Sequence, residues 1–484
     1  MGSIKKNFAY QSIYQITTII LPLVTSPFIA RVLGATNLGV YSYTYAIAYY
    51  FCLFSLLGIS NHGNRIIASV RDDSEELKKI FSNLLAVHCI LAGFAIIAYY
   101  LFIILSIKDD LLCAVIQGLW VVSSFFDISW LFFGLEKFKT TVTINTITKI
   151  LMTLFIFLFI KNENDIWIYC LIMAGGTLLS QVLLWPYMLK YFDIHLIRAK
   201  DMRPHLKPLL ILFIPAIAIS MYKYMDKIML GIIATKEQVG FYENAERAIN
   251  IPISIIASFG TVMLPKMSNL AVKNDDNETK RYIMLSMEFV MCLTIAMSFG
   301  MMSIADNFSI VFWGKPFQEC GPLIQILSFS IVFVAFANII RMQYLIPKRM
   351  DHAYITSVFV GAGINIIVNL FLIKQYGAIG ASIGTVAAEA IVCIVQIGYV
   401  KKELPVEKYL KKVIPFLIIG LIMYSITSIL KNIAQTEFIN LIIQIIFGIL
   451  SYSALCYLYF KKSNNEYFNE ISQNIIRRIH HGKI

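Results

Sequence analysis

Nine charged residues lie inside segments that are otherwise apolar enough to cross a membrane. They are Arg31, Asp127, Lys149, Lys223, Asp226, Lys227, Arg247, Glu288 and Glu389. A charge at the centre of a bilayer costs about 3 kcal/mol on insertion scales, so such residues usually face a bundle interior or a water-filled cavity. Cations placed there can bind phosphate, and acids can pair with them or titrate. These residues therefore predict a polar path through lipid.

Most of the cations fall in the outer halves of their segments. Lys223, Asp226 and Lys227 are spaced i, i+3, i+4, which puts them on one helix face and lets Asp226 partly neutralise both lysines. Arg31 and Arg247 fall near the same depth in other segments. A cationic vestibule of this kind suits phosphate, which arginine grips with two hydrogen bonds. The alternative is a self-paired cluster whose lysines reach the outer surface.

The other charges lie at different depths. Lys149 falls near the middle of its segment, where reaching the surface is hardest, so a cavity position is favoured. Glu389 is also near mid-segment, and it could titrate, pair with Lys149 or form a structural buried pair. Asp127 and Glu288 lie toward predicted cytoplasmic ends, where an interfacial position competes with a role in coupling or gating.

Uncharged polar groups and further acids complicate a simple anion site. With Glu243 and Glu246 counted, acids number six against five cations, so anion binding must depend on which face each charge takes. Asn365 and Asn369, four residues apart, could bond a sugar, although a bond to a neighbouring helix is favoured. Tyrosines near residue 45 could stack on sugar rings or form an interfacial belt.

Composition decides which elements must position these residues. The 484 residues are 58% hydrophobic and 14% charged, with a mean hydropathy of +0.71, whereas about a quarter of a soluble protein is charged. Only helices and closed barrels satisfy every backbone group in lipid, and the apolar runs here are of helix length and do not alternate. We therefore expect an all-α integral membrane protein.

Polar breaks divide the chain into about fourteen spans. We expect them at 9–33, 38–60, 81–106, 111–134, 141–160, 167–189, 208–233, 240–263, 282–304, 321–340, 353–373, 378–400, 413–430 and 438–460. With a cytoplasmic N-terminus, 30 lysines and arginines fall on inside segments and six on outside loops. This strong bias predicts that both termini are cytoplasmic. The net charge of +12 then reflects topology and attraction to anionic lipid, not nucleic-acid binding.

An internal repeat with an offset near 200 residues predicts two six-helix lobes. Leu33-Gly34 precedes Gly39-Val40-Tyr41, and Leu230-Gly231 precedes Gly240-Phe241-Tyr242. Both passages join the first two spans of a half, and substrate sites of repeat-built transporters lie between the repeats. The predicted organisation is an N-terminal lobe at 1–200, a C-terminal lobe at 201–400, two additional helices at 401–460 and an amphipathic cytoplasmic tail at 461–484, with an interlobe linker at 190–207.

Catalytic and metal-binding motifs do not appear in the sequence. It has no G-x-S-x-G, H-E-x-x-H or P-loop, and its seven histidines are scattered. The eight cysteines occur singly, mostly within apolar runs, as small hydrophobic filler does. We therefore expect no enzyme, no metal site and no cofactor.

Four passages together resemble the Wzx-type polysaccharide flippases of the multidrug/oligosaccharidyl-lipid/polysaccharide exporter superfamily. They are FIARVLGA at 28–35, WLFFGLEK at 130–137, DKIMLG at 226–231 and YGAIGA at 376–381. The resemblance implies a fourteen-helix, two-lobed transporter that moves a polyprenyl-pyrophosphate-linked oligosaccharide from the cytoplasmic to the outer leaflet by alternating access. It also implies that Arg31, Lys149, Asp226, Lys227 and Arg247 line the cavity for the head group, and we add Lys223 to this set from its spacing.

The resemblance leaves several alternatives open. It places the protein in a bacterial plasma membrane, with a glycan destined for capsule, teichoic acid or a similar surface polymer and with membrane lipids and other polysaccharide-assembly proteins as partners. Coupling to an ion is common in the superfamily, but no residue tells proton from sodium. A cation-coupled multidrug exporter is the second hypothesis. A glycan polymerase or acyltransferase is remote, because it needs large catalytic outer loops and the longest expected here is about 305–320.

Overall fold

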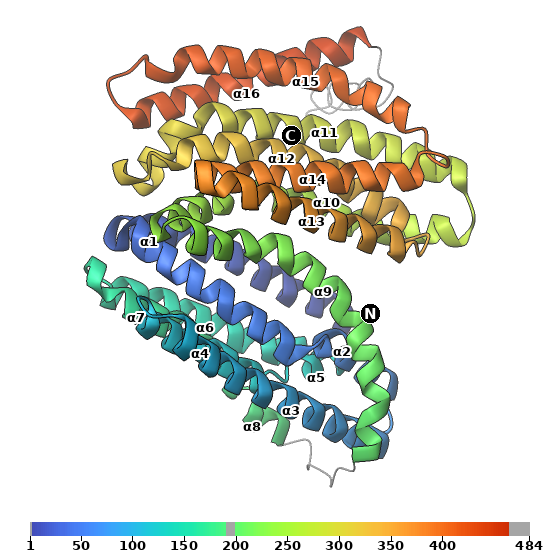
Figure 1. Ribbon diagram of the computed structural model, residues 1–484. Coiled ribbons are helices and arrows are strands. Elements are labelled where there is room, and N and C mark those ends of the chain that lie inside the picture. The colour runs from blue at the N-terminus through green and yellow to red at the C-terminus, as the bar shows by residue number, and fades with distance from the viewer. Residues whose placement is uncertain (1, 190–198, 464–484) are drawn as a thin grey trace. The chain divides into compact units, whose positions relative to one another are not determined.

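The computed structural model describes residues 2–189 and 199–463, and every regular element in these ranges is a helix (Figure 1). The α-helices are α1 (Gly2–Leu56), α2 (Ile59–Val70), α3 (Ser74–Ser106), α4 (Leu111–Phe125), α5 (Ser129–Gly134), α6 (Phe138–Phe159), α7 (Ile166–Val182), α8 (Trp185–Leu189), α9 (Ala199–Ile233), α10 (Lys236–Val272), α11 (Asp276–Trp313), α12 (Cys320–Ile340), α13 (Asp351–Tyr376), α14 (Ala378–Val400), α15 (Val406–Ile429) and α16 (Glu437–Lys462). The expected all-α class is confirmed.

The described helices provide thirteen stretches that are long and apolar enough to cross a membrane. The first, Thr17–Val70, has 54 residues, about 80 Å of helix at 1.5 Å per residue, which is far more than one bilayer needs. Gly34 interrupts α1 with φ 75° and ψ 172°, a backbone conformation open essentially only to glycine. The interruption falls between the predicted spans 9–33 and 38–60, so the prediction of about fourteen spans agrees with the fold.

Several helices extend past the predicted spans. The structure begins α3 at Ser74, where Asp73 caps it by accepting hydrogen bonds from the backbone N–H of Glu75 and Glu76, and it continues α10 to Val272. Hydropathy marks the part of a helix that lies in lipid, whereas the helix itself continues through polar residues until a cap ends it. The predicted span 111–134 is also divided, because the chain breaks between α4 and α5.

Contacts divide the chain into two compact units. Unit 1 comprises Met1–Asn244 and Ala362–Gly384, and unit 2 comprises Ala245–Gly361 and Thr385–Ile484. These boundaries fall inside α10, α13 and α14, so they do not test the lobes predicted at 1–200 and 201–400, which stay predictions. The predicted tail lies almost entirely outside the described residues, as do residues 190–198 of the predicted linker.

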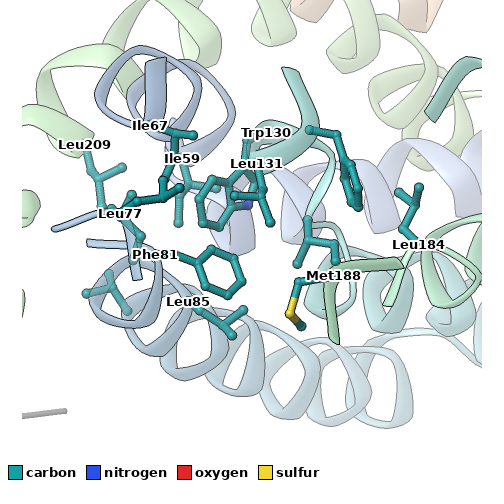
Figure 2. Packing of buried hydrophobic residues seen from close by; sticks show 14 residues of the cluster. Ile59, Ile67, Leu77, Phe81, Leu85, Trp130, Leu131, Leu184, Met188 and Leu209 are labelled. Carbon is teal, nitrogen blue, oxygen red and sulfur yellow. The ribbon is translucent and has the colours of Figure 1, made fainter. Parts of the chain in front are cut away.

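An apolar cluster in unit 1 packs α2, α3, α5, α8 and α9 together. Figure 2 shows its side chains, among them Phe81 of α3, Trp130 of α5 and Met188 of α8. The rings of Phe81 and Trp130 lie 5.6 Å apart, and both residues are fully buried. A second buried cluster joins α1, α3 and α4, where the Tyr99 hydroxyl donates to the carbonyl of Ala114 at 2.6 Å. The second cluster fixes α3 and α4 against α1.

Candidate functional site

A buried carboxylate on α9 lies at the centre of the polar interior of unit 1. Asp226 has only 1% of its surface exposed. Its Oδ2 accepts a hydrogen bond from the Tyr242 hydroxyl of α10 at 2.7 Å, and its Oδ1 accepts one from the Asn369 amide of α13 at 2.5 Å. Bonds to a charged acceptor are among the strong ones in proteins. Asp226 therefore ties α9 to two other helices.

An ion pair lies next to this carboxylate in the sequence. Lys227 is buried, and its Nζ lies 2.5 Å from the Glu243 carboxylate of α10. The sequence predicted that Asp226 partly neutralises its neighbouring lysines, and the structure adds Glu243 as a partner for Lys227. The exposed Lys223 lies with its Nζ 5.6 Å from the centre of the Tyr224 ring. We call Asp226, Lys227, Tyr242, Glu243, Asn365 and Asn369 the Asp226 cluster.

Aromatic rings of α1 and α9 lie beside the Asp226 cluster. Tyr224 stacks on Tyr49 with ring centroids 3.9 Å apart, and the Lys227 Nζ lies 5.3 Å from the Tyr224 ring. Tyr45 meets the Trp120 ring edge-on at 5.0 Å. The predicted row of tyrosines is thus packed mainly against other rings of the protein, which gives the charged groups an aromatic border.

Two asparagines of α13 complete the cluster. Asn369 donates to Asp226 and to the Asn365 Oδ1, the latter at 3.1 Å, so the favoured prediction of a bond to a neighbouring helix is confirmed for Asn369. Both asparagines are fully buried, and the Asn369 Oδ1 and Asn365 Nδ2 have no hydrogen-bond partner in the described part of the chain. A carboxylate beside amide oxygens is a set of hard oxygen ligands, the kind that hard cations prefer. In the same residues, no group of three His, Cys, Asp or Glu side chains could hold a metal ion.

The remaining predicted binding residues lie elsewhere on the helices. Arg31 is exposed on α1, three residues before the interruption at Gly34. Lys149 is half-buried on α6, and its Nζ lies 5.0 Å from the ring of Tyr14 on α1. Arg247 is half-buried on the part of α10 that belongs to unit 2. Asp226 and Lys227 thus belong to the Asp226 cluster, and a common site for all six residues stays a prediction.

The three acids predicted for coupling or gating have different surroundings. Glu288 of α11 pairs with Lys412 of α15 at 3.5 Å. Glu389 of α14 is half-buried within the electrostatic reach of Arg341, which lies in the π-helical turn Arg341–Leu345 after α12. Asp127 lies at the break between α4 and α5, where it accepts hydrogen bonds from the Ser129 backbone and hydroxyl at 2.9 and 2.5 Å.

Unit 2 contains an apolar cavity of about 550 Å³. Its walls come from α10, α11, α15 and α16, with Ile255, Phe289, Met297, Met423 and Ile445 among the lining residues. The hydroxyl of Tyr452, another lining residue, donates its hydrogen to the carbonyl of Cys292 at 2.6 Å, so this hydrogen is not available to a ligand in the cavity. This cavity suits a hydrocarbon chain, and the sequence predicted no such site, because its lining is indistinguishable from ordinary membrane-helix residues.

Sequence reasoning also missed Tyr242 and Arg341 as members of charged sites. Both lie in apolar helices, and their partners are reached only by helix packing, because 16 residues separate Tyr242 from Asp226 and 48 separate Arg341 from Glu389. The one available signal for Tyr242 is its place in the repeated Gly-x-Tyr passage.

A family model, two relatives and a solved structure resemble this chain. Residues 4–271 match the model of a family described as polysaccharide biosynthesis protein. A Shigella dysenteriae protein named as an O-antigen transporter is 22% identical over 82% of this chain and 100% of its own length. A Haloferax volcanii protein named as the low-salt glycan biosynthesis flippase Agl15 is 24% identical over 49% of this chain and 50% of its own. The structure of the lipid II flippase MurJ covers 94% of this chain and 99% of its own, with a TM-score of 0.76 and 19% identity, so the two folds are alike.

Proposed function

Because the chain belongs to the polysaccharide biosynthesis protein family, we propose that it is a flippase that carries a lipid-linked glycan from the cytoplasmic to the outer leaflet. Two relatives are named as a transporter and a flippase of glycans, and neither is named as an enzyme. The observation that carries the proposal is the Asp226 cluster, a hydrogen-bonded set of charges buried in membrane helices. Intramembrane charges of this kind mark the pathways of polar substrates.

The substrate that fits these groups best is a polyprenyl-pyrophosphate-linked oligosaccharide. We assign the binding of pyrophosphate to five cations, Arg31, Lys149, Lys223, Lys227 and Arg247. Asp226 belongs to the same site and holds α9 in place through its hydrogen bonds. Tyrosines and amides bordering the charges offer hydroxyl groups and ring faces to sugars. The apolar cavity of unit 2 offers a place for part of the prenyl chain. A surface polymer such as capsule or teichoic acid is the expected product of the pathway.

Transport requires that the site open to either side in turn. We propose that the two lobes at 1–200 and 201–400 alternate in this way, in a bacterial plasma membrane with both termini cytoplasmic, and that other polysaccharide-assembly proteins receive the glycan. The bias of 30 inside against six outside cations supports this orientation.

An ion could drive the cycle through the Asp226 cluster. The Asp226 carboxylate and the amide oxygens of Asn365 and Asn369 are ligands suited to sodium, and a carboxylate also takes a proton. We propose Asp226 as the main coupling residue, with Asp127, Glu288 and Glu389 as candidates for coupling or gating. Transport into sodium-free liposomes at fixed pH separates the two ions, because a sodium-coupled protein stops and a proton-coupled one continues.

The decisive experiment follows lipid-linked glycan in cells that lack the protein. If the proposal is right, glycan accumulates on the inner leaflet, outer-leaflet labelling falls, and the wild-type chain restores it. Lys149→Ala and Arg31→Ala should then insert normally and fail to restore labelling. Unchanged outer-leaflet labelling in the deletion cells would remove the flippase proposal. Drug sensitivity without glycan accumulation would favour a multidrug exporter instead.

A further inference from the structure

A buried histidine in unit 1 has no role in the Asp226 cluster. His88 lies in the middle of α3 with none of its surface exposed. Within the described residues, neither of its ring nitrogens has a hydrogen-bond partner. Leaving a buried polar group unsatisfied costs about 1–3 kcal/mol. A histidine kept in such a position calls for a ligand that the protein side chains do not supply.

The packing of α3 against α4 places an acid opposite this histidine. The two helices run antiparallel, and the bond from the Tyr99 hydroxyl to the Ala114 carbonyl fixes their register. Counting 11 residues from this pair along each helix, His88 comes level with Phe125, the last residue of α4. His88 lies there within the electrostatic reach of Asp127.

Asp127 is held firmly and still has capacity to accept. Its Oδ1 accepts both hydrogen bonds from Ser129, while its Oδ2 accepts none from the described residues. Two tryptophans fix the surrounding backbone, since the Trp130 indole donates to the Asp127 carbonyl at 3.1 Å and the Trp185 indole donates to the Phe126 carbonyl at 3.0 Å. One carboxylate oxygen is therefore available in a preformed position.

Further buried polar groups lie on α4 and α1. Gln117 of α4 is fully buried, and neither atom of its amide has a hydrogen-bond partner in the described ranges. Ser124 donates to the hydroxyl of Ser55 on α1 at 2.7 Å. We call Ser55, His88, Gln117, Ser124 and Asp127 the polar seam of unit 1. Enclosed polar positions that lack partners are where proteins hold ordered water.

Several helices contribute residues around the polar seam. From α1, the thiol of Cys52 is the titratable group that interacts with Asp127. The neighbouring parts of α5 and α8 contribute apolar and indole side chains, among them Leu131, Leu184 and Met188. The helices α2 and α9, which also pack against α3, carry the hydrogen-bonded pair His62 and His205, and α2 carries the exposed Arg65. Within the polar seam itself, a proton meets one carboxylate and one imidazole.

We propose that His88 and Asp127 form a proton-binding site in the interior of unit 1, bridged by ordered water along the polar seam. The imidazole takes the proton, the carboxylate balances its charge, and water satisfies the ring nitrogens and the Gln117 amide. This site consists of residues different from those of the Asp226 cluster. It does not rest on the proposed glycan substrate.

The test observes the histidine directly. Full-length protein labelled with ¹⁵N-histidine is placed in liposomes, and imidazole signals are recorded by solid-state NMR between about pH 5 and pH 8, where an ordinary histidine titrates. Subtracting the spectrum of His88→Gln isolates His88. We expect this signal to change from neutral to protonated as pH falls. In Asp127→Asn, we expect the ratio of protonated to neutral His88 to fall about tenfold at a given pH, because the balancing charge is gone.

His352 provides the matched control, because it is exposed at the start of α13 in unit 2. Its signal, isolated with His352→Gln, should be unchanged by Asp127→Asn. A His88 that stays neutral throughout, or that titrates identically in Asp127→Asn, would overturn the proposal. If His88→Gln fails to fold, Asp127→Asn still decides, since one histidine signal must respond to it.

Discussion

The two units handle charge differently. In unit 1, the side chains of Lys227 and Glu243 pair with 7% and 13% of their surface exposed. In unit 2, the lysines of the pairs Lys412–Glu288 and Lys431–Asp306 are 41% and 43% exposed. Exposed pairs contribute little to stability, whereas a buried pair costs much desolvation and is strongly destabilised when one partner is removed. Of these three pairs, the one with both side chains buried belongs to unit 1, although the Glu288 side chain of unit 2 is itself only 11% exposed.

The two units also differ in the residues that line their interiors. The 550 Å³ cavity of unit 2 is lined mostly by aliphatic, aromatic and methionine side chains, while the interior of unit 1 holds Asp226, its amide and tyrosine partners and the polar seam. An apolar residue at Asp226 would avoid the desolvation cost, so stability alone does not explain this residue. Unit 2 also has a smaller polar cavity of about 370 Å³, lined by Asp306, Lys431 and Glu437 among others. We propose that the Asp226 cluster serves polar recognition and that the 550 Å³ cavity serves hydrocarbon contact.

The largest expected effect breaks the polar side of this contrast. Asp226→Ala removes the acceptor of Tyr242 and Asn369 and leaves two buried donors unsatisfied. We expect transport of lipid-linked glycan to be abolished, while Asp306→Ala in unit 2, which removes a half-exposed pair, keeps transport near wild type. Outer-leaflet labelling in complemented deletion cells measures both. Equal transport by the two variants would contradict the contrast.

The next prediction concerns stability. Lys227→Met leaves Glu243 buried without its cation, and we expect unfolding free energy to fall by about 3–5 kcal/mol. Lys348→Met of unit 2 leaves Asp276, whose side chain is 59% exposed, and should cost about 0–1 kcal/mol. Denaturant unfolding of purified variants compares them. The double variant Lys227→Met/Glu243→Gln should recover much of the loss, and failure to recover would mean that Lys227 acts through packing instead.

The sequence was sufficient to predict the fold class but not the pairing of the charges. Long apolar runs and a biased distribution of lysine and arginine report directly on lipid, so the helical spans were predictable, including the interruption near Gly34. Helix ends were less predictable, because α3 and α10 continue through polar residues beyond the lipid-sized run. A charge in an apolar run was enough to mark Asp226 and Lys227 as buried.

The partners of these buried charges are set by helix packing, which no local sequence pattern predicts. Asn369 lies 143 residues from Asp226, and Glu243, a partner of Lys227, lies on another helix, α10. His88 gave no signal, since one histidine in an apolar helix looks like filler until its ring nitrogens are found without partners. The positions of Arg31, Lys149 and Arg247 in a common site stay predictions.

A smaller effect is expected on the apolar side of the contrast. Ala296→Trp fills part of the unit 2 cavity, and Ile446→Trp places the same ring on an exposed position of α16. If the cavity holds part of a prenyl chain, Ala296→Trp lowers transport about tenfold, the order expected when a hydrophobic site loses part of its contact. Ile446→Trp should behave as wild type. Transport assays in liposomes with long- and short-chain lipid carriers check this, because a short carrier should be less sensitive to Ala296→Trp.

The smallest effect separates two lysines of the same helix. Lys223 is exposed with its Nζ 5.6 Å from the Tyr224 ring, an interaction worth about 0.5–1 kcal/mol, whereas Lys227, one turn further, is buried and paired. Lys223→Gln should therefore leave stability nearly unchanged and lower transport about threefold, and Lys223→Arg, which keeps the charge, should restore it. The loss should shrink in high salt, because salt screens an exposed charge and not a buried pair. A salt-independent loss as large as that of Asp226→Ala would place Lys223 with the buried charges.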